Sequence, residues 1–245
     1  MDTLLVHLIA IVVINLLIFT NSFRLNPLRF TCSNYILNAY LYIVLSLLLM
    51  MFCIIANERY ELLPVNWKLY MISALVSFGL LIVLLHLNPK NIISKHLIWL
   101  LLLGTFAYTM YPLYQNNKEL FIKTGTKTLA IVIIFTVIAF LFPSLIKDSW
   151  GTYLSLALIA AIVAMIVETV LTMTNTVDPQ SKTYRGYQKY FSYALIILFV
   201  FFILSDTKQI IRKSHNCRNP DYINNSLHII LDSMNLFSNV YHSSL

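Results

Sequence analysis

The sequence predicts an all-α membrane protein that crosses the bilayer several times. Hydrophobic residues make up 59% of the 245 residues, charged residues make up only 11%, and the mean hydropathy is +0.76. A soluble domain of this length has too little interior to bury so much apolar surface, whereas lipid-facing helices need no such burial. The apolar runs do not alternate as the strands of a membrane barrel would, so the fold is predicted to be a helical bundle.

Seven apolar runs approach the roughly 20 residues that a membrane-spanning helix needs. They are Thr3–Thr20, Tyr35–Ala56, Leu69–Leu87, Leu97–Tyr114, Leu129–Ile146, Tyr153–Met173 and Tyr190–Ser205. An eighth run, Asn224–Tyr241, is more polar. Short loops separate the runs, so neighbouring helices are expected to be antiparallel. Pro112 and Pro143 lie inside runs and are expected to kink them, because proline removes a helix hydrogen bond.

The first run can be a signal peptide or a helix that stays in the protein. A signal peptide has a basic start and a cleavage site of small residues. Asp2 is acidic, and Asn21–Arg24 is a poor cleavage site. We therefore expect Thr3–Thr20 to be retained, with Arg24 and Arg29 holding the next loop in the cytosol.

The net charge of +7 is spread over the loops, which favours contact with lipid headgroups over nucleic-acid binding. Basic residues are almost equally divided between the two sides of the predicted topology. The dense cluster in Lys208–Arg218 favours a cytosolic position for that loop.

Cysteine usage does not indicate a metal site or a disulfide framework. Cys32, Cys53 and Cys217 are odd in number and lack metal-ligand spacing, and Cys53 lies inside an apolar run. We expect unmodified thiols.

Asp232 lies in the middle of the nearly uncharged eighth run, where an ionised side chain costs on the order of 3 kcal/mol. Polar residues recur on both sides of it at steps of three and four, which places five side chains, including its own, on one helical face. They are Asn225, His228, Asp232, Asn235 and Asn239. The face can point to the bundle interior or a water-filled cavity, or the helix can lie on the membrane surface. The scarcity of Lys and Arg in the stripe favours the interior.

Two further acids each allow two interpretations. Asp206 follows the run Tyr190–Ser205, so it either marks the point where a helix leaves the bilayer or, if the helix continues to about Arg212, lies beside Asp232. Glu168, deep in the sixth predicted span, either lines the same cavity or forms local hydrogen bonds with a nearby threonine, Thr169 or Thr172.

Several short motifs resemble the transmembrane Bax-inhibitor-motif family. The segment Ser205–Ile211 resembles its DTQ-I signature, and Asp221–Ile223 followed by Leu231–Phe237 is similar to its DYI and YLD-x-x-NLF ending. Weaker likenesses occur at the loops Asn88–Asn91 and Lys147–Asp148. The resemblance covers roughly Arg29 to Tyr241.

This resemblance implies a seven-helix Bax-inhibitor-like bundle with a polar C-terminal helix, plus an extra N-terminal transmembrane helix. It divides the chain into residues 1–28, a hydrophobic helix with a basic linker, and residues 29–245, the transmembrane domain. It also implies that Asp206 and Asp232 face each other as a pH-sensing pair in a pore that leaks calcium. Two carboxylates that share a site titrate as a unit and would bind Ca²⁺ only weakly and transiently.

Other polar residues are candidates for lining the same pore or cavity. They are Asp221, His228, Asn235 and Glu168. Asp221 matches the acid that opens the last segment in the family, and stabilising the exposed N–H groups of a helix start explains it equally well. No cofactor is expected, with Ca²⁺ only as the permeant ion.

The chain also departs from the family pattern. Ile230 replaces the usual tyrosine two residues before the aspartate, and Ser233-Met234 replaces an apolar pair. Bacterial members set an arginine from an early helix against the aspartates, whereas Leu69–Leu87 offers only His86. The resemblance therefore does not extend to that latch.

The resemblance predicts a pH-sensitive calcium leak channel of the endoplasmic reticulum or Golgi that inhibits apoptosis. The composition, rich in Asn, Ile and Lys, is similar to that of viral members such as the poxviral Golgi anti-apoptotic proteins, which implies action in a host cell. One alternative is a non-conducting adaptor that binds host membrane or apoptosis-regulating proteins, and another is a proton-coupled transporter. No phosphate loop, zinc motif or nucleophile elbow indicates an enzyme. The sequence does not specify the oligomeric state.

Overall fold

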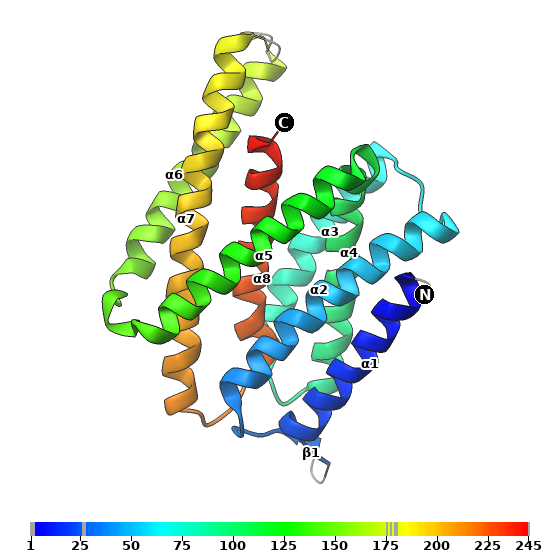
Figure 1. Cartoon of the computed structure of the whole chain (residues 1–245), viewed down its shortest axis with the longest axis vertical. Helices are drawn as coiled ribbons and strands as arrows, with labels where there is room; N and C mark the ends of the chain where they lie inside the picture. Colours follow the sequence, from blue (N-terminus) through cyan, green and yellow to red (C-terminus); the bar gives the residue numbers. More distant parts are fainter. Residues whose placement is uncertain (1–2, 26–27, 175, 177, 179–180, 245) are drawn as a thin grey trace. The chain divides into compact units, whose positions relative to one another are not determined.

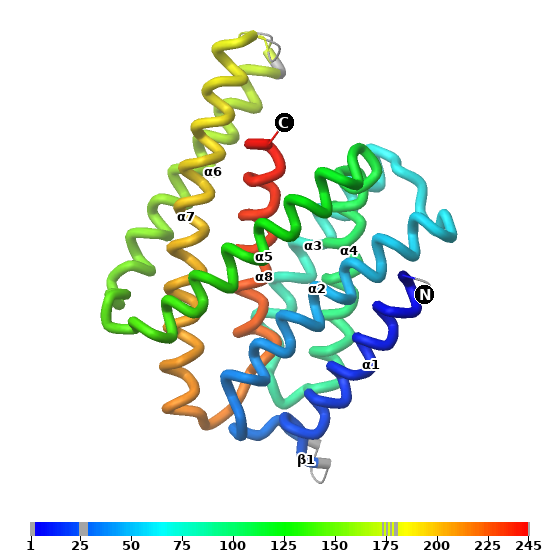
Figure 2. Tube along the Cα trace, in the orientation of Figure 1, coloured from blue at the N-terminus to red at the C-terminus, as the bar shows by residue number. Residues whose placement is uncertain are grey.

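The structure is a computed structural model that describes residues 3–25, 28–174, 176, 178 and 181–244. Almost all of this part of the chain is helical (Figures 1 and 2). The α-helices are α1 (Thr3–Ser22), α2 (Tyr35–Tyr60), α3 (Trp67–His86), α4 (Ile92–Asn116), α5 (Lys118–Leu141), α6 (Trp150–Met173), α7 (Lys182–His215) and α8 (Tyr222–Ser243). Within the described residues, α1 to α7 are long and apolar enough to cross a membrane. The predicted all-α polytopic fold is confirmed.

The chain forms two compact units. The first contains Met1–Lys118 and Ile210–Ile230, and the second contains Glu119–Gln209 and Leu231–Leu245. Both α7 and α8 therefore contribute to each unit, since the division falls within these two helices.

In the first unit, α2 packs against both α1 and α4, and α3 packs against α4. Helix α2, which packs against two helices, is the most buried of these three: 44% of its apolar stretch is buried, against 11% in α1 and 11% in α3. The exposed sides of α1 and α3 are almost wholly apolar, as contact with lipid requires. Side chains buried at the centre of this unit are Ala39, Tyr42, Leu45, Leu102, Leu103, Tyr222, Ile223 and Leu227.

A short hairpin separates α1 from α2, which the sequence pattern did not predict. Strands β1 (Phe23–Leu25) and β2 (Leu28–Phe30) are antiparallel, with Phe23 opposite Phe30. The two aromatic rings lie 4.8 Å apart between centroids. Phe30 also contacts Tyr222 at 5.2 Å, so the hairpin packs on the start of α8.

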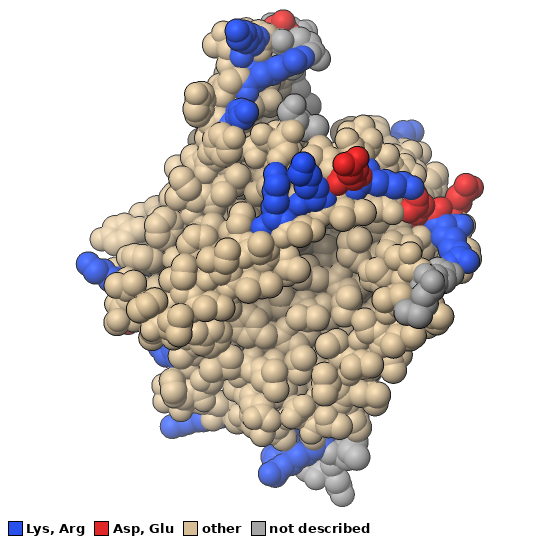
Figure 3. All heavy atoms as spheres, viewed as in Figure 1, with Lys and Arg blue, Asp and Glu red and all other residues tan. Residues whose placement is uncertain are grey.

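The second unit contains α5, α6, most of α7 and the second half of α8. One part of its core is formed by Ala139, Ile146 and Leu204, and another by Phe121 and Phe237, whose ring centroids are 4.8 Å apart. On the face that Figure 3 shows, Lys and Arg gather near helix ends, and the stretches between them carry mostly uncharged residues. This distribution suits helices that cross a lipid core.

The helix of the fifth run ends earlier than the sequence predicted. Helix α5 ends at Leu141, and Pro143 begins a short 3₁₀ turn, η1 (Pro143–Leu145). The expectation that Pro143 would kink a continuous helix is therefore wrong. The cause is steric, because proline disfavours helical geometry in the preceding residue, and Phe142 has φ −130° and ψ 54°. Pro112, in contrast, lies inside α4.

Candidate functional site

Asp206 on α7 and Asp232 on α8 lie together in the second unit. Their carboxyl groups lie close enough to interact electrostatically and to form a hydrogen bond when one of them is protonated. Asp232 is 8% exposed, and its Oδ2 atom is buried without a hydrogen-bond partner among the described residues. A hydrogen bond between two carboxyl groups requires a proton on one of them, and two ionised carboxylates that face each other, one of them buried, would repel each other. This arrangement allows the two carboxyl groups to share one proton.

The length of α7 explains how Asp206 reaches this position. The helix continues to His215, which places Asp206 about two and a half turns before its end. This satisfies the geometric condition for contact with Asp232. Lys208, two residues further on, lies elsewhere: its Nζ atom pairs with Oδ1 of Asp148 at 2.9 Å and donates to the backbone oxygen of Ile146.

A second buried charge lies in the first unit, and the sequence interpretation missed it. Lys95 is fully buried, and its Nζ atom lies 2.5 Å from Oδ2 of Asp221. The same ammonium donates to the backbone oxygen of Leu87 at 3.1 Å. Lys95 precedes the apolar run Leu97–Tyr114 of the sequence analysis, but it belongs to the first turns of α4. Its signal was present in the sequence, because Lys95 shares a helical face with the apolar residues Ile92 and Trp99.

Asp221 also begins α8. Its Oδ1 atom accepts a hydrogen bond from the backbone N–H of Asn224 at 3.1 Å, which is the geometry of a helix N-cap. One carboxylate therefore caps α8 and binds α4 through Lys95.

The expectation of unmodified thiols is wrong for Cys32 and Cys217. These residues form a disulfide with a Cα–Cα distance of 5.9 Å, across 185 positions of sequence, and Cys53 is a free cysteine. Neither the count nor the spacing of the cysteines indicates the pair, because only the fold brings the end of the hairpin segment against the α7–α8 loop. Disulfides persist in oxidising compartments and are rare in the cytosol.

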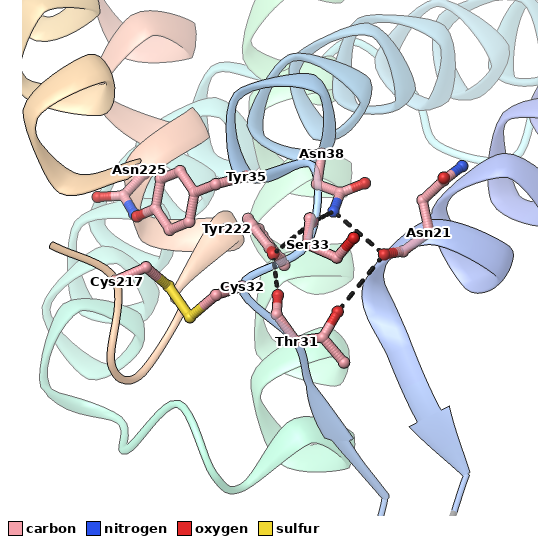
Figure 4. The surroundings of a disulfide bond; sticks show 9 residues. All are labelled: Asn21, Thr31, Cys32, Ser33, Tyr35, Asn38, Cys217, Tyr222 and Asn225. Atoms are coloured by element: carbon pink, nitrogen blue, oxygen red, sulfur yellow. Dashed lines mark hydrogen bonds between the residues drawn. A yellow bond between two sulfur atoms is a disulfide. The ribbon is translucent and has the colours of Figure 1, made fainter. Parts of the chain in front are cut away.

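Hydrogen bonds reinforce the link that the disulfide makes (Figure 4). The hydroxyl of Tyr222 donates to the backbone oxygen of Thr31, and Nδ2 of Asn225 donates to the hydroxyl of Tyr35. Lys213 donates to Oδ1 of Asn225 at 2.6 Å. The end of α7, the α7–α8 loop and the start of α8 are thus fastened to the start of α2 and to the segment before it.

The polar stripe of α8 is only partly interior. Asn225 and Asp232 are buried, whereas His228 and Asn235 are exposed. His228 lines an open pocket at the end of α7. The amide of the exposed Asn235 donates to the Leu231 backbone oxygen of its own helix at 2.9 Å, so its place in a pore or cavity stays a prediction. Satisfied in this way, an amide needs no partner on another helix.

Glu168 belongs to a separate cluster. Its Oε1 atom accepts hydrogen bonds from the hydroxyl of Tyr184 at 2.6 Å and from the amide of Gln188 at 3.0 Å, both on α7. Thr172 donates to the backbone oxygen of Glu168, not to its carboxylate. At 1.5 Å per residue, roughly 27 Å of helix separate Gln188 from Asp206. Glu168 therefore lies away from the aspartate pair.

Among the described residues, no group of three or more His, Cys, Asp or Glu side chains is placed to hold a metal ion. Calcium takes six to eight oxygen ligands, and Asp206 with Asp232 supplies at most four. The pair alone therefore cannot complete a calcium coordination shell.

Comparison with protein families gives one match. A family model described as Inhibitor of apoptosis-promoting Bax1 matches residues 32–242. The chain belongs to the Bax-inhibitor family. The match covers α2 to α7 and nearly all of α8, and α1 precedes it. No curated protein matches the chain.

Family membership and seven apolar helices together make the protein an integral, multi-pass membrane protein. The matched region contains both members of the aspartate pair, the Lys95–Asp221 ion pair and the disulfide. The two acids of the pair, Asp206 and Asp232, lie on the last two helices of this region, α7 and α8.

Proposed function

We propose that this Bax-inhibitor family protein is a pH-sensitive, calcium-permeable leak channel of an intracellular membrane. The observation that carries the proposal is the buried contact between Asp206 and Asp232. A carboxyl pair at membrane depth is costly, and it adds little to the stability of a helix pair that apolar residues could join as well. Its retention is explained if the pair responds to protons and cations.

The pair would act as a proton-dependent contact between α7 and α8. With one shared proton, a hydrogen bond holds the carboxyl groups together. When that proton leaves, two like charges remain in a dry site, and the state in which they separate or meet a cation is favoured. The weak attraction of a cation to the two carboxylates lets the ion enter and leave, as conduction requires.

The disulfide supports an endomembrane location. Cys32 and Cys217 would stay oxidised where one face of the membrane borders an oxidising lumen, as in the endoplasmic reticulum and the Golgi. We propose these organelles as the site of action, and the restraint of apoptosis through reduced calcium stores as the consequence. The resemblance to poxviral relatives supports action in the host cell of a virus.

The experiment is calcium flux from vesicles that contain the purified full-length protein, measured over a range of pH. We expect flux that depends on pH in the wild type and a flat profile in Asp232→Asn. Glu119→Gln, which neutralises an exposed acid of α5, is the matched control and should retain the wild-type profile. Unchanged flux and pH dependence in Asp232→Asn would contradict the mechanism.

The alternative is a non-conducting adaptor that binds host proteins. It predicts no flux in vesicles and protection of cells that survives neutralisation of both aspartates but fails when the α6–α7 connection is replaced. The segment to replace is 175–189, which contains that connection and the first turns of α7. Its residues 175, 177, 179 and 180 lie outside the described part of the chain. A cell-death assay with Asp206→Asn/Asp232→Asn separates the two proposals.

A further inference from the structure

An open, polar pocket of about 630 Å³ lies at the C-terminal end of α7, within the first unit. Its volume falls in the range of small-molecule sites, roughly 300 to 1,000 Å³. Three cationic side chains line it, Arg212, Lys213 and Arg218, together with amides that include Asn216 and Asn219 and the imidazole of His228. We propose that this pocket binds a phosphate group, carried by a free phosphate compound or by a lipid headgroup.

The charge balance favours an anion. Asp221 also lines the pocket, but its carboxylate already pairs with the fully buried ammonium of Lys95 at 2.5 Å. The negative charge of Asp221 is therefore neutralised by Lys95, which does not line the pocket. The three cations then give the pocket a net positive charge. An arginine guanidinium offers a planar set of N–H donors that matches two phosphate oxygens at once.

Ordinary helix-end stabilisation does not account for the whole cluster. Arg212 and Lys213 lie in the last turn of α7, where cations interact favourably with the exposed carbonyl groups. Arg218 follows the helix by three residues and has no such role. The tendency of basic loops to stay in the cytosol does not explain these basic residues either. The disulfide of the neighbouring Cys217 indicates that this loop faces the oxidising side of the membrane.

The walls of the pocket are held in place before any ligand binds. Cys217 is bonded to Cys32, and Asn225 lies against Tyr35 (Figure 4), to which it donates a hydrogen bond. Lys213 in turn donates to Asn225. Both Asn225 and Tyr35 line the pocket. Because the loop is already ordered, a ligand would not have to offset the entropy of ordering it.

Calorimetric titration of the full-length protein in neutral detergent tests the site. The probes are inorganic phosphate and dioctanoyl phosphatidic acid, with dioctanoyl phosphatidylcholine for comparison. We expect saturable binding that weakens roughly tenfold in Arg212→Gln and in Arg218→Gln, since each loses a charge-assisted hydrogen bond. Both side chains are exposed, so these variants should fold.

Lys90→Gln is the matched control, because it removes one exposed charge from the α3–α4 loop, outside the pocket. Its affinity should equal that of the wild type. Binding of both phosphate and phosphatidic acid would identify a phosphate site, and binding of phosphatidic acid alone would identify a headgroup site. The proposal is overturned if neither probe binds saturably, or if Lys90→Gln weakens binding as much as Arg212→Gln.

Discussion

The Nζ atom of Lys95 lies 2.5 Å from Oδ2 of Asp221 and joins the first turns of α4 to the cap of α8. The lysine side chain is fully buried and that of Asp221 is 19% exposed. This ion pair links an early helix to the last one in the first unit. It fixes where α8 begins.

Removing one partner of this ion pair should destabilise the protein. Lys95→Met leaves the Asp221 carboxylate without its cation, and loss of one partner of a buried pair costs about 3 kcal/mol or more. Thermal unfolding in detergent should show a clear drop in the midpoint for Lys95→Met and little change for Lys90→Met. A drop of the same size in both variants would show that the buried pair has no special role.

The sequence predicts the seven spans because each is a long apolar run, and a hydrocarbon core of fixed thickness demands that length. The proximity of Asp206 and Asp232 comes only from the resemblance of two motifs to the Bax-inhibitor family, because the pattern alone leaves the position of Asp206 open. Lys95 was missed because counting charges by loop ignores the helical face on which a residue lies. That face carries Ile92 and Trp99, which are buried.

The disulfide could not be predicted from the sequence, because the pairing of Cys32 with Cys217 depends on long-range packing of the hairpin segment against the α7–α8 loop. The exposure of Asn235 could not be predicted either, for a different reason. Periodicity shows that five polar side chains share a face, but it does not show which of them bond to their own helix. Asn235 donates to Leu231 and so needs no interior partner.

Loss of the disulfide should reduce stability whichever cysteine is replaced. Cys32→Ser and Cys217→Ser should each lower the free energy of unfolding by about 2 to 4 kcal/mol. The double variant should be no less stable than either single variant, because the same bond is lost. Thermal unfolding without reductant measures the effect, and Cys53→Ser, which replaces the free thiol, is the control. Additive losses would contradict the bond.

The disulfide also predicts the topology of the membrane insertion. The α3–α4 loop lies on the same side as the Cys32–Cys217 bond, since Leu87 and Asp221 share the ammonium of Lys95. A Lys90→Cys probe in a variant without other cysteines should therefore face the lumen. In sealed microsomes, a membrane-impermeant maleimide should label it only after permeabilisation. Labelling of intact microsomes would place this side in the cytosol, as the basic loops alone suggest.

The two aspartates should act as one titrating unit. Asp206→Asn and Asp232→Asn should each remove most of the pH dependence of calcium flux, and the double variant should add little, because groups in direct contact are strongly non-additive. The measurement is the double-mutant cycle of flux in vesicles between acidic and neutral pH.

Glu168→Gln is the discriminating control for this cycle. Its carboxylate bonds to Tyr184 and Gln188, roughly 27 Å along α7 from the pair, so the pH profile should stay at that of the wild type. Additive effects of Asp206→Asn and Asp232→Asn would mean that the acids titrate separately. A flat pH profile in Glu168→Gln would identify the Glu168 carboxylate, near the start of α7, as the proton sensor in place of the aspartate pair.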